Sequence, residues 1–357
     1  MTTRIEPSRI FTEHGEPANF QPFRRNVGFA RLPRVPRTVV QALVLWSRAR
    51  RHRGLAAFVT YGGMTGFALA WIQTILKPLI APRTHVMFDL LLERRRRGLA
   101  GLFDRLKMVA FREAGVRAMV WGMDDGDVFA REYDVPRDRF QFHPYHTTLD
   151  GFAVDPGDDG FLFAGGNNGR DYATLIAALR EVEYPAIVAT TNPDVPPLAR
   201  GLPHVTVKGV SPEEFRRLLA RCTLLVEAHP PDFIRTAGHQ TLLNAMSLGK
   251  PIVMADRRSA PGYLEHGREG LVVAAGDAAG LAAAVKELLA DRERRARMAE
   301  AGRTRLADPL YGTAQHMQSI YNYALRLEHR RTGRSGEPEL IECYGPATVG
   351  ILPPEFA

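Results

Sequence analysis

Short apolar runs alternate with longer amphipathic runs over most of this sequence. In the first half, the runs at 56–63, 84–90 and 117–123 have the apolar character of strands, and segments of helical period separate them. Neighbouring parallel strands need a crossover connection, and a helix is the usual one. The alternation therefore predicts an α/β fold with doubly wound parallel sheets.

A segment rich in proline, glycine and aspartate interrupts this pattern at 144–160, and a second alternating series follows it. Such a break is typical of a linker, and the chain is long enough for two domains with separate cores. We therefore expect two Rossmann-like domains that face a cleft. The expected parts are an N-terminal domain at 1–150 with an irregular start at 1–36, a C-terminal domain at 151–330 with a closing helix at 313–330, and a tail at 331–357.

The chain is basic, with 47 Lys and Arg against 39 Asp and Glu and a formal net charge of +8. A basic excess favours a polyanionic partner or an anionic membrane surface. No DNA- or RNA-reading motif accompanies the charge, so nucleic acid is not an expected partner. The two cysteines, Cys222 and Cys343, lack the spacing of a zinc site or a disulfide framework, which favours a reducing, cytoplasmic location.

Two further observations bear on location. The first residues contain no apolar core of a signal peptide. The most apolar stretch, at 66–82, is interrupted by Lys77 and Pro78 and is shorter than the roughly 18 to 20 apolar residues of a membrane span. We expect this stretch to be a buried helix that leads into the next strand.

Much of the basic charge lies in one segment, 93–115. Its apolar residues form a single helical stripe of Leu99, Leu102, Phe103, Leu106, Val109 and Ala110. One interpretation is a helix that packs its stripe on the core and exposes a basic face. The other is a surface for anionic lipid, which would suit a protein peripheral to the inner face of a membrane and a membrane-associated acceptor.

One candidate anion site follows the strand at 161–166. This strand ends in Gly165 and Gly166, and Arg170 then opens a helix. Glycines let backbone amides approach a phosphate, a helix N-terminus favours negative charge, and an arginine forks onto phosphate oxygens. An ordinary strand-to-helix turn with a surface arginine would have the same sequence.

A second loop of this kind opens the helix that ends before Gly249. It contains Gly238, His239, Gln240 and Thr241, whose amides would point toward the carboxyl ends of the strands, where ligands of open parallel sheets bind. The His239 side chain is either a donor to a phosphate or sugar, or a solvated loop residue. Two such loops in one domain suit a diphosphate, because a diphosphate has two groups to hold.

Four segments of the second half together carry a resemblance. They are "FAGGNNGRDYATLIAAL", "VTVKGVSPEEFRRLLARCTLLV", "GHQTLLNAMSLGKPIV" and "YLEHGREGLVVAAGDAAGLAAAVKELLAD". In this order and at these distances, they resemble the donor domain of the retaining GT-B glycosyltransferases of family four, over residues 160–325. Residues 37–150 resemble the short acceptor domain of these enzymes only loosely.

The resemblance implies a nucleotide-sugar donor in the cleft between the domains, with no metal or other cofactor required. It assigns the diphosphate to Arg170 and to the helix N-terminus at 238–241, and the base to the backbone of Lys208, Gly209 and Val210. The implied activity is hexosyl transfer to an acceptor hydroxyl with retention. Cell-surface polysaccharide, glycolipid or secondary-metabolite assembly would use such a reaction.

At two positions the chain departs from the family. The family usually has two glutamates eight residues apart, the second of which bonds the ribose hydroxyls, and here these positions hold Thr236 and Asn244. Asn244 can still bond a diol, although a neutral amide is a weaker acceptor than a carboxylate. An impaired donor site would leave a nucleotide-binding or scaffold subunit. A third alternative is a nucleotide-sugar epimerase.

The N-terminal domain is expected to supply the acceptor site. Asp89 lies near the carboxyl end of the strand at 84–90, where it would orient an acceptor hydroxyl or the sugar, or cap a helix. Asp124 and Asp125, after the next strand, compete for this role. His85, at the start of its strand, is expected to pack under the sheet.

In the second domain, His229 follows the strand "TLLVEAH" and is placed near the expected sugar position. We therefore take Asp89, Arg170 and His229 as the candidate catalytic residues. No carboxylate pair at ligand spacing stands beside the two phosphate loops, so no metal site is expected.

Overall fold

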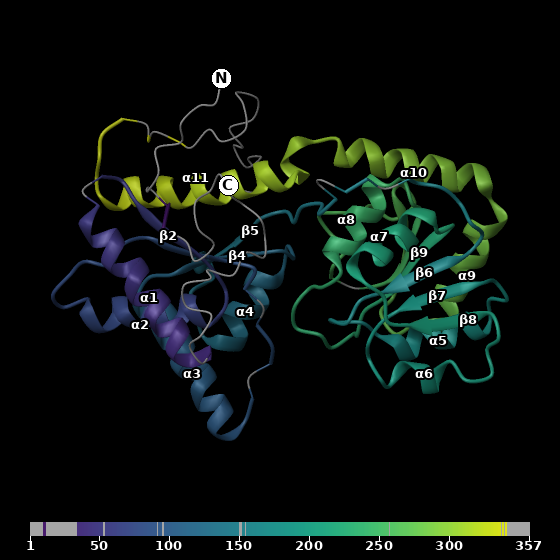
Figure 1. The fold of residues 1–357 in the computed structure, drawn as a ribbon, viewed down its shortest axis with the longest axis horizontal. Helices are drawn as coiled ribbons and strands as arrows, with labels where there is room; N and C mark the ends of the chain where they lie inside the picture. The colour runs from purple at the N-terminus through teal and green to yellow at the C-terminus, as the bar shows by residue number, and fades with distance from the viewer. Residues whose placement is uncertain are drawn as a thin grey trace. The chain divides into compact units, whose positions relative to one another are not determined.

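The computed structural model describes residues 10–11, 34–52, 54–90, 92–94, 96–149, 152–153, 155–256, 258–336, 338 and 340. Cys343, most of the segment 1–36 and most of the tail lie outside these residues. The chain divides into two compact units, the first formed by Met1–His143 and Ala314–Ala357, the second by Pro144–Thr313. Each unit has its own parallel sheet (Figure 1).

The sheet of the first unit has the strand order β1-β2-β3-β4-β5, with all neighbours parallel. Its strands are β1 (Ile10–Phe11), β2 (Ala57–Tyr61), β3 (His85–Phe88), β4 (Arg117–Val120) and β5 (Phe140–Phe142). Its helices are α1 (Arg34–Arg51), α2 (Met64–Leu76), α3 (Gly98–Glu113), α4 (Asp125–Tyr133), α11 (Thr313–Arg331) and the 3₁₀ turn η3 (Arg137–Arg139). The sequence did not predict β1 or β5, because two or three residues are too few to show a period.

Helix α11 belongs to the first unit, whereas the sequence assigned it to the second domain. Glu328 accepts a hydrogen bond from the backbone N–H of Thr84 at 2.9 Å, and the Ser319 hydroxyl lies 2.5 Å from His143 Nε2. The predicted extent of the helix, 313–330, agrees with α11. A helical period does not, however, indicate which core the apolar face of the helix covers. The boundary between the units falls at His143, earlier than the expected one at 150.

The sheet of the second unit has the strand order β11-β10-β9-β6-β7-β8. Its strands are β6 (Leu162–Gly165), β7 (Ala186–Ala189), β8 (Val205–Lys208), β9 (Leu224–Ala228), β10 (Ile252–Ala255) and β11 (Gly270–Val273). Its helices are α5 (Tyr172–Arg180), α6 (Val195–Leu198), α7 (Pro212–Arg221), α8 (His239–Ser247), α9 (Ala278–Ala290), α10 (Arg292–Leu306) and the 3₁₀ turn η4 (Pro309–Tyr311). All six strands match the predicted alternation, which confirms the α/β class with parallel sheets.

A dry core fixes the central strands of this second unit. Val188, Val226 and Val253 from β7, β9 and β10 are fully buried and pack with Leu281 of α9. Strands buried on both faces need apolar residues throughout, which explains their continuous apolar runs. Because the strands are parallel, their carboxyl ends meet at one edge of the sheet, and the loops after β6, β9 and β10 become neighbours there.

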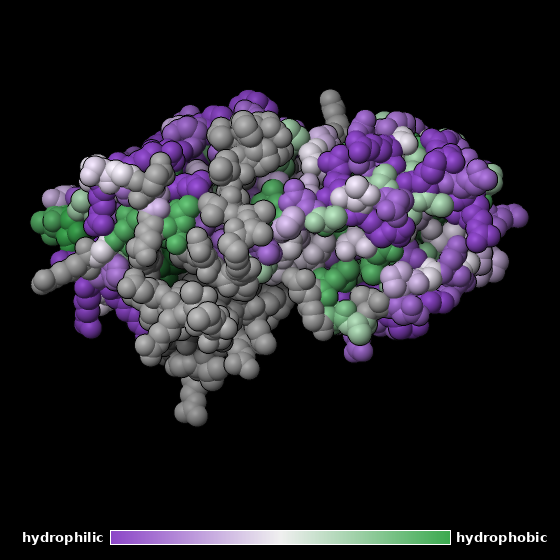
Figure 2. Space-filling model, turned by 90° about the horizontal axis from the view of Figure 1, so that it is seen from above, coloured by the Kyte–Doolittle hydropathy of each residue, from purple (hydrophilic) through white to green (hydrophobic). Residues whose placement is uncertain are grey.

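Both units expose hydrophobic residues. In Figure 2 hydrophobic areas are visible on each unit, beside hydrophilic surface. The exposed large hydrophobic residues of the first unit are Val39, Leu43, Ile75, Leu79, Leu99, Leu102, Phe103, Leu106 and Met123. Among the described residues, no helix combines the length and the apolar character that crossing a membrane requires.

Candidate functional site

The loop after β6 folds its own arginine back over the chain. Gly165 packs so closely under Phe215 that an added Cβ would lie 2.5 Å from the ring. Gly166 has a φ of 119°, and its backbone lies under the Arg170 guanidinium, 3.1 Å from the place of a Cβ. The two glycines therefore do more than close a turn, because Gly165 makes room for Phe215 and Gly166 makes room for the arginine that the sequence singled out.

Arg170 forms a buried ion pair with Glu227. Its Nη2 lies 2.9 Å from Glu227 Oε1, and its Nε donates to the Gly165 carbonyl at 2.9 Å. The Nη2 group also donates to Thr241 Oγ1 at 3.4 Å. The side chain of Arg170 is 7% exposed and that of Glu227 is 0% exposed. Glu227 thus holds the arginine in one orientation at the sheet edge.

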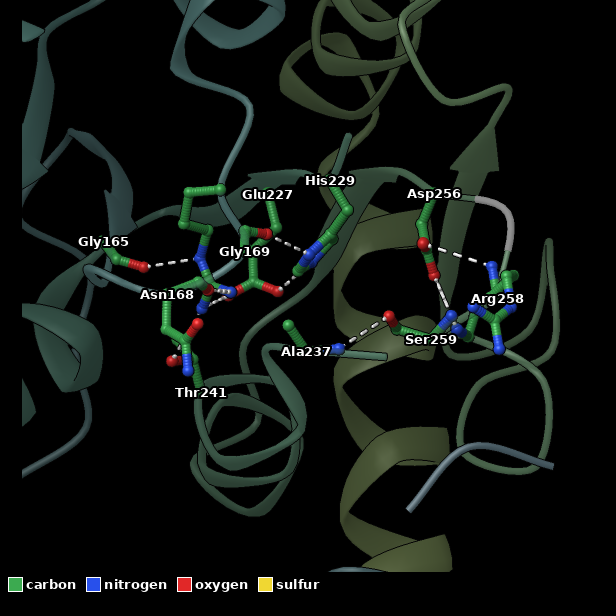
Figure 3. A network of polar contacts seen from close by, with 12 residues as sticks. Gly165, Asn168, Gly169, Glu227, His229, Ala237, Thr241, Asp256, Arg258 and Ser259 are labelled. Atoms are coloured by element: carbon green, nitrogen blue, oxygen red, sulfur yellow. Dashed lines mark hydrogen bonds and ion pairs between the residues drawn. The ribbon is translucent and has the colours of Figure 1, made fainter. Parts of the chain in front are cut away.

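His229 completes this charged cluster from the same strand end (Figure 3). Its Nδ1 lies 2.8 Å from the Gly169 carbonyl and its Nε2 lies 3.3 Å from Glu227 Oε2. Both neighbours are acceptors, so a doubly protonated ring donates to both. The ring is 3% exposed, which places His229 beneath the loops. Its assignment as a catalytic residue stays a prediction.

Gly238 lies directly over the cluster. Its φ is 85°, and a Cβ here would lie 2.7 Å from His229 Cε1, 2.8 Å from Glu227 Oε2 and 3.0 Å from Arg170 Nη1. Gly238 is also the N-cap of α8 and offers no side-chain cap to the first amides of the helix. Uncapped amides and the positive end of the helix dipole therefore lie beside Arg170, as the anion-site hypothesis requires.

Residues that follow a third strand, β10, hold the chain just before Gly238. Asp256, after β10, accepts hydrogen bonds from the amides of Ser259 and Ala260, the latter at 2.8 Å. The Ser259 hydroxyl in turn lies 3.3 Å from the backbone N–H of Ala237 (Figure 3). The sequence did not single out Asp256 or Ser259. The signal that could have indicated Asp256 is its place directly after the apolar strand β10, where ligands of parallel sheets bind.

The side chain of His239 is buried rather than solvated. It is 4% exposed, and its ring centroid lies 4.4 Å from that of Tyr263. Burial, together with the neighbouring charge of His229, lowers the pKa of His239 to about 3. The ring is therefore neutral near pH 7, and the solvated-loop alternative is wrong. A contact between residue 239 and a nucleotide stays a prediction.

Asn244 and Gln240 both bond Thr148. Asn244 Oδ1 accepts from the Thr148 amide at 2.9 Å, and its Nδ2 donates to the Thr148 hydroxyl at 3.0 Å. Gln240 Nε2 donates to the same hydroxyl at 2.8 Å. Both polar atoms of the Asn244 amide thus hold the segment that precedes β6. A ribose contact of Asn244 stays a prediction, and it requires these bonds to be exchanged.

The expected base-binding backbone lies at the end of the edge strand β8. Lys208 ends this strand, and its Nζ lies 3.7 Å from the Glu214 carboxylate. Gly209 and Val210 follow directly, next to the loop after β7. Strand β7 separates β8 from β6, so these three residues are one strand farther from Arg170 than the loop after β7. Their role stays a prediction.

In the first unit, Asp89 lies at the carboxyl end of β3, as expected. Its φ of 52° is left-handed, which is unusual for a residue other than glycine, and its Oδ1 accepts a hydrogen bond from Trp121 Nε1 at 3.0 Å. Strained residues of this kind gather at functional sites. Asp125 instead accepts from the Gly122 amide at 3.1 Å, which is a structural contact at the start of α4.

The packing prediction for His85 is confirmed. This residue is fully buried, and its Nε2 lies 2.8 Å from the Thr60 hydroxyl on the neighbouring strand. Burial lowers the pKa of His85 to about 3, so the ring is neutral near pH 7. His85 belongs to the core of the first unit.

Solved structures with similar folds define the class of this architecture. The chain is similar to sucrose-phosphate synthase from Thermosynechococcus elongatus, with a TM-score of 0.59 and 17% identity over 82% of this chain and 80% of that one. It is also similar to HepE from Anabaena in complex with UDP, with a TM-score of 0.59 and 14% identity over 83% and 82%. A third similar structure is a glycosyltransferase from Rickettsia africae, with a TM-score of 0.54 and 11% identity over 84% of this chain and 95% of that one. The fold is that of the GT-B glycosyltransferases.

The sequence comparison narrows this class. Residues 199–305 match the model of the family described as glycosyl transferases group 1. The matched region contains β9, the Gly238 loop and α8, which form one side of the cluster around Arg170. A comparison with curated proteins found no match.

Proposed function

We propose that this chain is a glycosyltransferase that moves a sugar from a nucleotide diphosphate sugar to an acceptor hydroxyl. The observation that carries the proposal is the meeting of Arg170 with the uncapped N-terminus of α8 at Gly238. A fixed cation and a helix N-terminus stabilise the charge that develops on a departing diphosphate. The family match over 199–305, which includes α8, supports the same reaction.

Arg170 has one N–H group left for a ligand. Four of its five N–H groups donate to Gly165, Asn168, Glu227 and Thr241. The remaining one is on Nη1, which lies 3.0 Å from the place of a Gly238 Cβ. In our proposal this N–H and the amides of 238–241 bind the diphosphate.

The proposed reaction retains the configuration of the sugar, as in family four. The bond from the anomeric carbon to the diphosphate oxygen breaks, and the bond to the acceptor oxygen forms on the same face. The departing phosphate takes the proton of the acceptor hydroxyl, so no separate strong base is needed. Asp89 orients that hydroxyl in this proposal, because it is an acid with a left-handed φ at the carboxyl end of a strand.

The competing function is a nucleotide-binding or scaffold subunit with impaired catalysis. The observation that favours it is the pairing of Asn244 with Thr148, which occupies the amide in place of a ribose. Donor hydrolysis in the absence of acceptor separates the alternatives, because a scaffold binds the nucleotide without turnover. Isomerised donor with no transfer would indicate an epimerase.

UDP-glucose is the first donor to test and UDP the first nucleotide, because structures of the similar HepE contain them. Arg170→Lys keeps a positive charge beside Glu227 but loses the guanidinium fork. We expect nucleotide affinity to fall about tenfold, as for the loss of one hydrogen bond to a charged group. Isothermal titration of the tightest-binding nucleoside diphosphate measures this. Arg180→Lys on α5 is the control, and equal affinities of the two variants would refute the role of Arg170.

We also propose that transfer needs no divalent metal. Within the described part of the chain, no group of three or more His, Cys, Asp or Glu side chains could hold one. The expected result is that EDTA leaves the initial transfer rate unchanged and that added magnesium or manganese does not raise it. A rate that EDTA abolishes and either ion restores would contradict the proposal.

We propose that the first unit docks peripherally on an anionic membrane, at the cytoplasmic face. Four residues of the α3 stripe, Leu99, Leu102, Phe103 and Leu106, are exposed, with Leu99 87% and Leu102 53% exposed, whereas Ala110 is buried. Buried positions of α3 are Gly101, Asp104, Met108, Ala110 and Phe111, so the core-packing interpretation is wrong for Leu99, Leu102, Phe103 and Leu106. Arg96, Arg97 and Arg105 line a hollow beside Leu102. Exposed apolar and basic residues together suit a lipid surface.

Vesicle co-sedimentation tests the docking proposal. The full chain should bind phosphatidylglycerol vesicles and bind phosphatidylcholine vesicles more weakly. Combining Leu99→Ser with Phe103→Ser should reduce binding to the anionic vesicles about tenfold or more, since each side chain loses apolar burial in the bilayer. Leu198→Ser, an exposed leucine of the second unit, is the matched control. Unchanged binding of the α3 variant would exclude this surface.

A further inference from the structure

Four arginines converge on one hollow of the first unit. It has a volume of about 340 Å³ and lies where the end of α1, the turn after α2 and the end of α11 meet. Its lining residues are Arg50, Gly54, Leu55, Ile80, Ala81, Arg83, Glu328, Arg331, Thr332 and Arg334. We call it the arginine pocket. Four guanidinium groups face a single carboxylate, so the lining carries a net positive charge.

The one carboxylate of the pocket is already used within the protein. The side chain of Glu328 is 2% exposed, and it accepts two hydrogen bonds from Arg331 at 2.7 Å and one from the Thr84 amide at 2.9 Å. It also lies 4.0 Å from Arg83. Glu328 therefore orients two of the arginines and has little capacity left to neutralise the other two.

Arg83 is held rigidly at the inner side of the pocket. Its Nη2 donates to the His52 carbonyl at 2.7 Å and its Nη1 to the Ala56 carbonyl at 3.4 Å. Burial lowers the pKa of Arg83, the carboxylate of Glu328 opposes this, and the nearby charges of Arg331 and Arg334 lower it further. An anion in the pocket would relieve this crowding of like charges.

The arginine pocket belongs to the first unit, and the candidate site around Arg170 belongs to the second. Within the first unit, the pocket lies at the amino ends of the strands and not at their carboxyl ends. Leu55 and Arg83 stand just before β2 and β3, at the amino ends of the strands, whereas Asp89 marks the carboxyl ends. Its volume is within the range of small-molecule sites, about 300 to 1,000 Å³. Guanidinium groups match phosphate oxygens in geometry as well as charge.

We propose that the arginine pocket binds a phosphate or diphosphate group. The group belongs either to a soluble phosphorylated compound or to the headgroup of an anionic lipid, and the chemistry of recognition is the same for both. This site is independent of the proposed transferase activity. In this proposal Arg83 and Arg331 form the fixed base of the site, and Arg50 and Arg334, which are exposed, close on the anion.

Hydrogen–deuterium exchange of the full chain locates the site without using activity. Sodium pyrophosphate should slow exchange in the segments 50–56, 79–84 and 328–334, at an ionic strength matched with sodium chloride. Vesicles containing phosphatidic acid form the second arm, compared with phosphatidylcholine vesicles. Protection by pyrophosphate identifies a soluble ligand, and protection by the phosphatidic acid vesicles alone identifies a lipid headgroup.

The double variant Arg50→Gln with Arg334→Gln tests the two exposed arginines. It should raise the concentration of the effective probe needed for half-maximal protection about a hundredfold, as for the loss of two charge-assisted hydrogen bonds. Arg48→Gln, an exposed arginine of α1 outside the lining, is the matched control. The proposal is overturned if neither probe protects these segments beyond sodium chloride, or if the control weakens protection as much as the double variant.

Discussion

Glu227→Gln is expected to lower the free energy of unfolding of the second unit by about 3 to 5 kcal/mol, as for a broken buried ion pair. The carboxylate is 0% exposed and is the partner of both Arg170 and His229. A neutral amide of the same shape leaves the arginine charge buried without its counterion. Urea denaturation followed by far-UV circular dichroism measures the change.

Two comparisons separate this effect from a general loss of stability. Glu300→Gln breaks an exposed pair with Arg303, whose nitrogen lies 2.7 Å from the carboxylate, and should cost less than about 1 kcal/mol. The double variant Glu227→Gln with Arg170→Met removes both charges, so it should be more stable than Glu227→Gln alone. If Glu227→Gln costs no more than Glu300→Gln, the buried pair does not stabilise the unit.

Gly238→Ala is expected to destabilise the second unit by about 2 to 5 kcal/mol and to abolish nucleotide binding. Part of the cost is the left-handed backbone, about 1 to 2 kcal/mol for an L-residue. The rest is overpacking, about 1 to 3 kcal/mol, because the methyl group would meet His229, Glu227 and Arg170 at 3.0 Å or less. Urea denaturation and titration with UDP measure the two effects.

Gly201→Ala provides a closely matched control. Its φ of 79° is close to the 85° of Gly238, but no atom lies within 4 Å of its added Cβ. It should therefore show only the backbone part of the cost, and nucleotide affinity should not change. If both variants lose the same stability, the close packing of Gly238 over the charged cluster has no energetic consequence.

Local sequence patterns predicted the elements of the second unit well. The strand expected at 161–166 is β6 (Leu162–Gly165), and the strand expected in "TLLVEAH" is β9 (Leu224–Ala228). Both follow from local apolar runs of strand length. The two glycine-containing loops were likewise located, because parallel strands place their carboxyl ends at one edge.

Partners from distant segments were beyond these patterns. Nothing in the sequence paired Arg170 with Glu227, or Asn244 with Thr148, although Arg170 and Asn244 were both candidate site residues. The same limit explains α3, where a helical period was visible but the sequence left open whether the apolar stripe packs on the core or faces outward. An amphipathic pattern states that a helix has two faces, and only the neighbouring elements decide which one is buried.

By itself, the sequence determined the parallel α/β architecture, the two glycine loops and the position of Arg170 just before α5. These depend on local period, on glycine's access to positive φ and on the geometry of parallel strands. Only the tertiary structure decided that Glu227 and His229 lie beneath Gly238, that α11 returns to the first unit, and that four arginines share one pocket. Contacts between residues far apart in the chain set the burial and the charge of a site, and neither is encoded in a local pattern.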